Sequence, residues 1–116
     1  MMQKSSAHLN RAFVIIESDP IISMDLLGTV AAAFPQSSVY ISELVADALS
    51  PSNLSLVSTS ILINSVLVTE EYIDVLRDCV DNGAKLVFIG SAPDTDLPSV
   101  VIELPFTTSM ILNALS

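Results

Sequence analysis

The sequence predicts one α/β domain in which a parallel β-sheet is covered by helices on both faces. Short apolar runs alternate with segments of helical periodicity, which is the pattern of successive β-α units. The 116 residues suffice for one domain with a substantial core. The hydrophobic fraction of 51% is high, as expected for a sheet buried on both faces. A partner-binding surface is the second explanation of this apolar excess.

The first strand and helix follow a predicted disordered tail at residues 1–10, so the folded domain is expected at residues 11–116. The run AFVIIE at residues 12–17 is apolar up to its final acid, as in a strand buried on both faces. Asp19 can cap the next helix, and Pro20 suits its first position, where a missing N–H is no loss. The predicted buried face of this helix comprises Ile22, Leu26, Val30 and Ala33.

The second unit has weaker signals. Residues 38–44, SVYISEL, alternate only partly and include polar positions, so we expect an edge strand there. Ser50 and Pro51 have the form of a cap and a first-turn proline. They predict a short helix that ends at about Val57.

The third unit is more regular, and its strand, SILIN at residues 60–64, ends on Asn64. Thr69 is the expected cap of the next helix, and Gly83 supplies the left-handed stop after it. The expected buried face of this helix comprises Tyr72, Leu76, Cys79 and Val80. Cys79 is therefore interpreted as a core residue and not as a reactive thiol.

The last two strands are predicted within AKLVFIGS, residues 84–91, and SVVIEL, residues 99–104. The short connection between them contains Pro93 and Pro98. An average helix has about 11 residues, and an interior proline costs about 3 kcal/mol. We therefore expect the helix between strands four and five to be missing or very short, leaving one flank without its usual cover. A terminal helix should bury Met110, Ile111, Ala114 and Leu115.

The charge and composition exclude several classes of function. Thirteen acids against four bases give a net charge of −9, which disfavours binding to nucleic acids and anionic membranes. The single cysteine excludes an internal disulfide and a cysteine-based metal cluster. No apolar stretch reaches the roughly 18 residues that span a bilayer. The polar N-terminus has no signal pattern, so a cytoplasmic location is expected.

The chemistry of such a sheet is expected at the carboxyl ends of its strands. The residues that the sequence places there are Glu17, Ser18, Asp19, Asn64, Gly90, Ser91, Leu104, Pro105 and Phe106. An amide at the end of the third strand is notable, because a carboxylate there would be a nucleophile or a metal ligand.

These segments resemble those of response-regulator receiver domains, the CheY-like family. VIIESDPIISMDLL resembles the family's opening strand and acidic pair, and SILINSVL resembles the strand that presents the phosphoaccepting aspartate. LVFIGS resembles the strand with the switch hydroxyl, and IELPF the strand that ends in Lys-Pro-Phe. The resemblance runs from about Ala12 to the C-terminus. It implies a doubly wound, five-stranded parallel sheet of order 2-1-3-4-5, as in CheY and flavodoxin-like folds.

The chain departs from the family at the residues that handle phosphate. Asn64 stands at the position of the phosphoaccepting aspartate, and an amide oxygen is a very poor nucleophile. Glu17 matches one member of the acidic pair, Ser18 replaces the other, and Asp19 comes one residue late. Mg²⁺ prefers anionic oxygen ligands, so the resemblance implies a weakened metal site.

The remaining departures fit this interpretation. Leu104 stands at the position of the family's lysine, and either Ser91 or Gly90 matches the switch hydroxyl. Losing two anions would leave a lysine under-paired, and a buried unpaired charge is costly. Asn64 can donate to Glu17 or Asp19 without a metal. The predicted vestigial phosphorylation pocket therefore comprises Glu17, Ser18, Asp19, Asn64, Ser91 and Leu104, with no metal, cofactor or catalytic residue.

The leading functional interpretation is an atypical receiver that is not an enzyme. It would act as a phosphorylation-independent protein–protein interaction module in phosphorelay signalling. The uncovered flank predicts a homodimer or a protein partner at Val87, Ile89, Val101 and Ile102.

Several alternatives stay open. The chain would be an unusual active receiver if phosphorylation still occurred. An enzyme or small-ligand binder on a flavodoxin-like or Rossmann-like fold is disfavoured, because Gly28, Gly83 and Gly90 form no phosphate loop. Asn64 would be a simple turn residue in an unrelated α/β fold. As a separate alternative, Glu17 and Asp19 would be only helix-capping acids, with no vestigial pocket.

Overall fold

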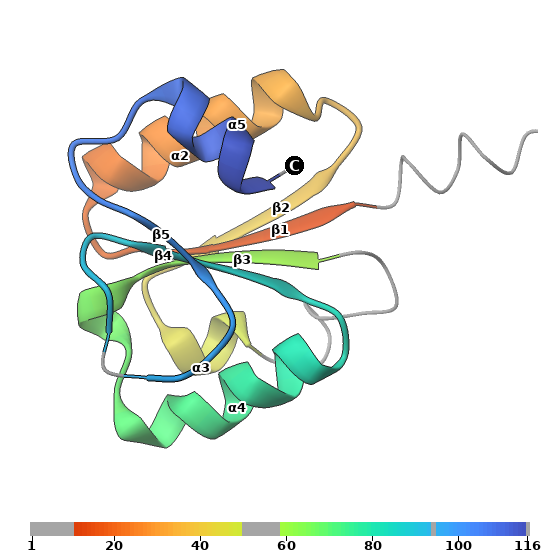
Figure 1. The fold of residues 1–116 in the computed structure, drawn as a ribbon. Helices are drawn as coiled ribbons and strands as arrows, with labels where there is room; N and C mark the ends of the chain where they lie inside the picture. The colour runs from red at the N-terminus through yellow and green to blue at the C-terminus, as the bar shows by residue number, and fades with distance from the viewer. Residues whose placement is uncertain (1–10, 50–58, 94, 116) are drawn as a thin grey trace, which may run out of the picture.

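The computed structural model describes residues 11–49, 59–93 and 95–115. Five parallel strands form one sheet in the order β2-β1-β3-β4-β5 (Figure 1), which confirms the predicted topology. The strands are β1 (Ala12–Ile16), β2 (Ser38–Ser42), β3 (Thr59–Asn64), β4 (Lys85–Ile89) and β5 (Val100–Ile102). The helices are α2 (Pro20–Ala33), α3 (Val45–Ala48), the 3-10 turn η1 (Ser65–Leu67), α4 (Glu70–Asp81) and α5 (Thr108–Leu115). None of the described helices is long and apolar enough to cross a membrane.

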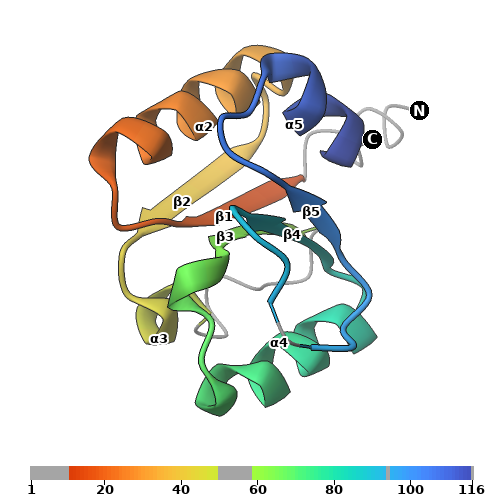
Figure 2. The ribbon, with the colours of Figure 1, turned by 60° about the vertical axis from the view of Figure 1, so that its left-hand side comes forward.

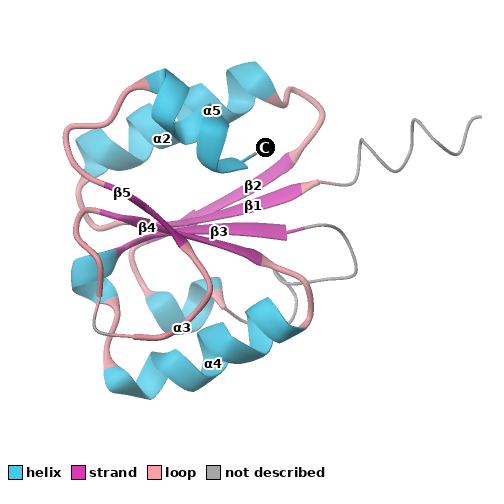
Figure 3. Cartoon of the chain, in the orientation of Figure 1, coloured by secondary structure: helices cyan, strands magenta, loops and turns pink. Residues whose placement is uncertain are grey.

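Helices lie on both faces of the sheet, with α2 and α5 on one side and α3 and α4 on the other (Figure 3). Because successive side chains of a strand point to opposite faces, strands β1, β3 and β4 each contribute to two cores. Phe13, Ile15 and Leu62 pack toward α2 and α5. Ile61 and Ile63 pack in the cluster that contains residues of α3 and α4. This arrangement explains why β1 and nearly all of β3 are buried.

Helix α2 begins where the sequence predicts. The Asp19 carboxylate accepts a hydrogen bond from the Ile21 N–H at 2.9 Å, and Pro20 occupies the first turn. Leu26 and Val30 are buried, as expected. Ala33 is exposed, so its predicted burial is wrong: it lines an open groove beside α5.

Helix α4 agrees with the prediction in its packing but not in its cap. Leu76 and Cys79 are buried, and Tyr72 and Val80 are partly buried against the same core. Thr69 occupies the N-cap position without a capping hydrogen bond from its side chain. Gly83 follows the helix with φ of 99°, in the left-handed region that glycine favours.

Two predicted features concern residues that the structure does not describe. The expected helix from Ser50 to about Val57 and the expected tail at residues 1–10 both lie outside the described residues. Ahead of that segment, the structure has a four-residue helix, α3, that begins at Val45, shortly after β2. Its residues Val45 and Ala48 are buried in the core.

The connection between β4 and β5 contains no helix among the described residues 90–93 and 95–99, in agreement with the prediction. The connection nevertheless covers part of the sheet, since Leu97 is only 5% exposed and belongs to the core on the α4 side. Asp96 accepts a hydrogen bond from Arg77 of α4 at 3.2 Å. The extended connection therefore covers part of the sheet face that the missing helix would have covered.

The predicted partner interface on this flank needs correction. Val87, Ile89 and Ile102 have exposed fractions of 3% or less, so no partner can contact them. Their side chains belong to the core between the sheet and α2 and α5, whereas the helix-free connection crosses the opposite face. Val101 alone of the four predicted residues is exposed, at 37%.

Candidate functional site

The carboxyl ends of β1, β3 and β4 meet at one edge of the sheet and bring Glu17 close to Asn64. Glu17 follows β1, and its backbone N–H extends the sheet by donating to the Ser42 carbonyl at 3.1 Å. Its side chain is only 4% exposed. Asn64 is the last residue of β3, and its backbone turns there into η1.

The Asn64 side chain binds the Glu17 carboxylate directly. Its Nδ2 donates to both carboxylate oxygens, at 2.9 Å to Oε1 and 3.1 Å to Oε2. Its Oδ1 accepts from the Val66 N–H at 3.0 Å. Rotating the amide by half a turn would set its oxygen against the carboxylate, so this network fixes its orientation.

A second donor completes the environment of the Glu17 carboxylate. The Asp19 N–H donates to Oε2 at 3.0 Å. Burying a carboxylate is costly unless hydrogen bonds compensate for its lost hydration. Here the compensation comes from an amide side chain and a backbone N–H, both belonging to this chain.

Asp19 and Ser18 take other roles than a metal-binding pair. The Asp19 side chain is exposed and caps α2, so its carboxylate is directed to the Ile21 N–H. Ser18 is also exposed. The structure therefore brings the Glu17 carboxylate, and not that of Asp19, to Asn64.

Ser91 lies at the same edge, linked to a residue that the sequence analysis overlooked. The Ser91 N–H donates to the Ser65 Oγ at 3.1 Å, and the two hydroxyl oxygens are 3.4 Å apart. The sequence does contain a signal for Ser65: it directly follows Asn64 at the end of β3. Gly90 completes the corner with φ of 116°, and a Cβ there would lie 3.1 Å from the Ser65 Oγ. A side chain at Gly90 would thus be strained by both its backbone and this contact.

Leu104 follows β5, and its side chain is 43% exposed. It precedes Pro105 across a cis peptide bond. Because the leucine side chain has no donor, it supplies nothing that would bind an anion at the strand ends.

The residues at this edge do not fit a Mg²⁺ ion. Magnesium requires near-octahedral oxygen coordination, with carboxylates as the usual protein ligands. Glu17 offers one carboxylate, and both of its oxygens already accept hydrogen bonds. Within the described part of the chain, no group of three or more His, Cys, Asp or Glu residues is placed to hold a metal. The Asn64 Nδ2 donates its protons to Glu17 and is not a nucleophile. The geometry therefore supports a hydrogen-bonded side-chain pair and not a site for a metal or a phosphoryl group.

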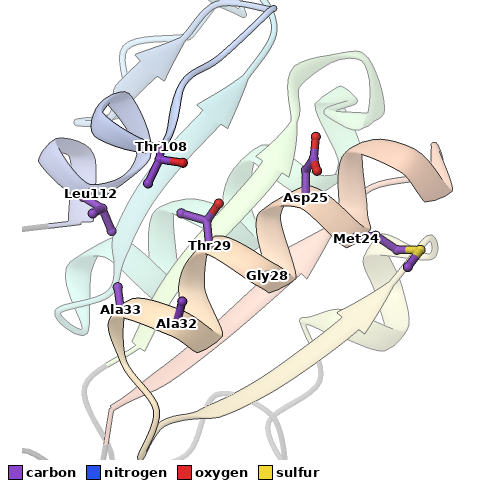
Figure 4. Close-up of a pocket in the computed structure, with 8 residues that line it drawn as sticks. All are labelled: Met24, Asp25, Gly28, Thr29, Ala32, Ala33, Thr108 and Leu112. Carbon is purple, nitrogen blue, oxygen red and sulfur yellow. The ribbon is translucent and has the colours of Figure 1, made fainter.

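The molecule also has an open groove between α2 and α5, shown in Figure 4. Its lining residues are Met24, Asp25, Gly28, Thr29, Ala32, Ala33, Thr108 and Leu112. The groove shares no residue with the strand-end corner. Asp25 is its one ionisable side chain, and the lining presents no set of groups suited to acid–base or nucleophilic chemistry.

The fold is that of known receiver domains. A crystal structure of a CheY-like response-regulator receiver domain protein from Methanospirillum hungatei JF-1 superposes with a TM-score of 0.59. The match covers 91% of this chain and 90% of that one, at 14% sequence identity. Comparison of the sequence with family models and with curated proteins gives no match. The chain therefore has the CheY-like receiver fold, as its resembling segments predicted.

Proposed function

We propose that this protein is a non-enzymatic receiver-type module of a cytoplasmic phosphorelay pathway, and that it acts through protein–protein contacts without phosphorylation of its own. The receiver fold supports the general role in response regulation. The independence from phosphorylation is inferred from the chemistry of the strand-end corner. Residues 11–116 would form the interacting domain.

The carrying observation is the hydrogen bond from the Asn64 amide to both oxygens of the buried Glu17 carboxylate. In a receiver, the residue at this strand end attacks phosphorus. Here that residue is an amide whose donor and acceptor are both engaged. The contact also occupies the carboxylate that would otherwise help to bind the metal. One substitution thus removes the nucleophile and closes the metal position.

The charge distribution favours a basic protein surface as the partner. The sequence has a net charge of −9. Arg11 stacks over the Phe34 ring at 4.3 Å and donates to the Leu115 carbonyl at 3.3 Å. Arg77 is paired with Asp96. Because these cations are engaged within the chain, the acidic surface is left to attract positive charge and to accelerate encounter with a basic partner.

The first prediction concerns phosphoryl transfer. The full chain is incubated with acetyl phosphate and Mg²⁺, and its intact mass is measured. We expect no mass increase, because Asn64 cannot attack phosphorus and no carboxylate replaces it. A phosphorylatable receiver in the same reaction controls for the activity of the reagent.

A gain of one phosphoryl group on the chain would overturn the proposal and make it an unusual active receiver. Affinity capture of the unmodified chain from its native host tests the other half. Binding to a phosphorelay component, unchanged by acetyl phosphate, is expected. Loss of that binding on adding acetyl phosphate would contradict independence from phosphorylation.

A further inference from the structure

Strand β2 lies at one margin of the sheet (Figure 2), where it has a neighbouring strand on one side only. The Ser38 N–H donates to the Arg11 carbonyl, and the Ser42 carbonyl accepts from the Glu17 N–H, both at 3.1 Å. These residues therefore direct their backbone groups toward β1. Because the direction alternates along a parallel strand, the N–H and C=O groups of Val39 and Ile41 point away from the sheet.

The two edges of the sheet differ in how well they resist pairing with another chain. Protected edges are short, or carry charges or proline. Edge strand β5 has three residues and is followed by Glu103 and Pro105. Edge strand β2 has five residues, SVYIS, with no charge, proline or glycine. Within its own five residues β2 therefore has none of these protective features, and Glu43, which follows it, is its nearest charge.

The side chains of β2 are also incompletely covered. Tyr40 and Ile41 are each 38% exposed, although they point to opposite faces of the sheet. The next apolar residue, Leu44, is 59% exposed. Tyr40 lies on the face covered by α3, which is only four residues long. Ile41 lies on the face of α2 and α5. Among the described strands, β2 pairs with β1 alone. An edge of this kind, with exposed apolar side chains, favours addition of a further strand.

The sequence of β2 indicates which strand would be added. SVYIS is nearly palindromic: serines at both ends, β-branched residues next to them, and Tyr40 at the centre. We propose that two copies of this chain pair antiparallel through β2, about a twofold axis at Tyr40, and form one continuous sheet. A twofold interface requires a self-complementary surface, and a palindromic edge strand is one.

The outward backbone groups agree with this register. Val39 of one copy faces Ile41 of the other, and both have outward N–H and C=O groups, so they exchange two hydrogen bonds. Tyr40 faces Tyr40 of the second copy as a non-hydrogen-bonded pair, the closer kind. Val–Ile and Tyr–Tyr are stabilising cross-strand pairs.

Electrostatics does not oppose this register, despite the net charge of −9. Residues 38–42 contain no Asp, Glu, Lys, Arg or His. Glu43, the nearest acid, would face Ser37 of the second copy and not another carboxylate. The pairing thus places no like charges directly opposite one another. It is also independent of the Asn64–Glu17 corner, so it can fail while the proposed function stands.

The proposal is tested first by light scattering and sedimentation of the full chain over a range of concentrations. We expect the wild type to reach twice the mass of one chain, and Ile41→Lys to halve that mass. Val101→Lys is the matched control, because Val101 is 37% exposed on the opposite edge strand. It should remain dimeric. A monomeric wild type at every concentration, or a dimeric and folded Ile41→Lys, would overturn the proposal.

A cross-linking experiment tests the register and does not depend on whether Ile41→Lys folds. A non-hydrogen-bonded pair has Cα atoms about 4.5 Å apart, within the roughly 4.4–6.8 Å that a disulfide spans. Tyr40→Cys should therefore form a covalent dimer under mild oxidation. Ile41→Cys should not, because the two copies are offset by two residues, about 7 Å along the strand. The wild type, with buried Cys79, gives the background. Equal cross-linking of both variants, or of neither, contradicts this register.

Discussion

Glu17 presents, at the scale of one residue, the problem that Asn64 solves. Glu17 as a whole residue is only 4% exposed, and a carboxylate on a buried residue requires donors in place of water. A metal ion or a lysine could supply positive charge, but this chain uses two neutral donors, the Asn64 amide and the Asp19 N–H. Hydrogen bonds to a charged group are stronger than those between neutral groups. The corner therefore needs no bound cation.

Replacing Asn64 tests this explanation. In Asn64→Ala, the Glu17 carboxylate loses the amide that contacts both of its oxygens. We expect the free energy of unfolding to fall by about 1–3 kcal/mol, the usual cost of leaving a buried polar group without its partner. Urea denaturation at neutral pH measures the change.

Asn64→Asp provides the informative comparison. It places a second carboxylate where the donor was, so repulsion should destabilise the variant, and Mg²⁺ should restore part of the loss. The wild type and Asn64→Ala should show no comparable response to Mg²⁺. Equal stabilisation of all three proteins by Mg²⁺ would show that the ion acts elsewhere.

The sequence predicted only part of this corner. Strand-end reasoning, together with the family resemblance, brought Asn64 and Glu17 together, because carboxyl ends of parallel strands share one edge. The role of Ser65 depends on η1 and on the φ of Gly90. Such local backbone geometry has no periodic signal in the sequence. Asp19 was considered both as a site residue and as a helix cap, and its side chain makes the capping bond.

At the scale of elements, the connection from β4 to β5 has no helix among its described residues to pack it against the sheet. Other contacts must hold it in place. Beyond the Ser91–Ser65 hydrogen bond at its start, its described residues include Asp96, paired with Arg77, and the buried Leu97. The ion pair is exposed, and Asp96 in particular is 82% exposed. Exposed pairs contribute about 0–1 kcal/mol. Burial of Leu97 should therefore dominate.

Two variants separate these contributions. Leu97→Ala should lower the free energy of unfolding by about 2–5 kcal/mol, as for other buried leucines. Asp96→Asn, which keeps the shape but removes the charge, should lower it by less than about 1 kcal/mol. Chemical denaturation of both variants gives the comparison. A larger effect of Asp96→Asn would mean that charge anchors the connection.

The elements differ in how well the sequence predicted them. Strands β1 and β3 are continuous apolar runs, and α4 has apolar residues at helical spacing. These clear patterns predicted all three elements close to their observed bounds. Helix α3 has four residues, too few to show a period. The prediction of an uncovered flank at Val87 and Ile89 was wrong because these side chains lie on the face of α2 and α5. The covering by α2 and α5 depends on the whole tertiary arrangement.

At the scale of the whole molecule, the Cys79 thiol reports on global unfolding, because it lies buried in the core on the α4 face of the sheet. Cys79 belongs to the core cluster between the sheet and α4. Its burial, reinforced by the nearby charge of Asp78, raises the pKa of the thiol above its ordinary value of 9.0. Since the thiolate is the reactive form, the native thiol should be protected from alkylation in two ways. Burial keeps the reagent away from it, and the raised pKa keeps it protonated.

The same shift makes global stability depend on pH in a defined direction. Below pH 9.0 the thiol keeps its proton in the folded and the unfolded chain, so its contribution is complete. As the pH rises further, the unfolded chain releases the proton first, which favours unfolding, and the contribution is lost through the folded-state pKa. The free energy of unfolding should therefore fall more steeply above pH 9.0 in the wild type than in Cys79→Ala.

Urea titrations of both proteins on either side of this pH measure the difference. Iodoacetamide labelling of Cys79 should accelerate only as urea unfolds the chain. Parallel pH dependences, together with rapid labelling of the native protein, would mean that Cys79 is exposed to solvent far more often than the packed core allows.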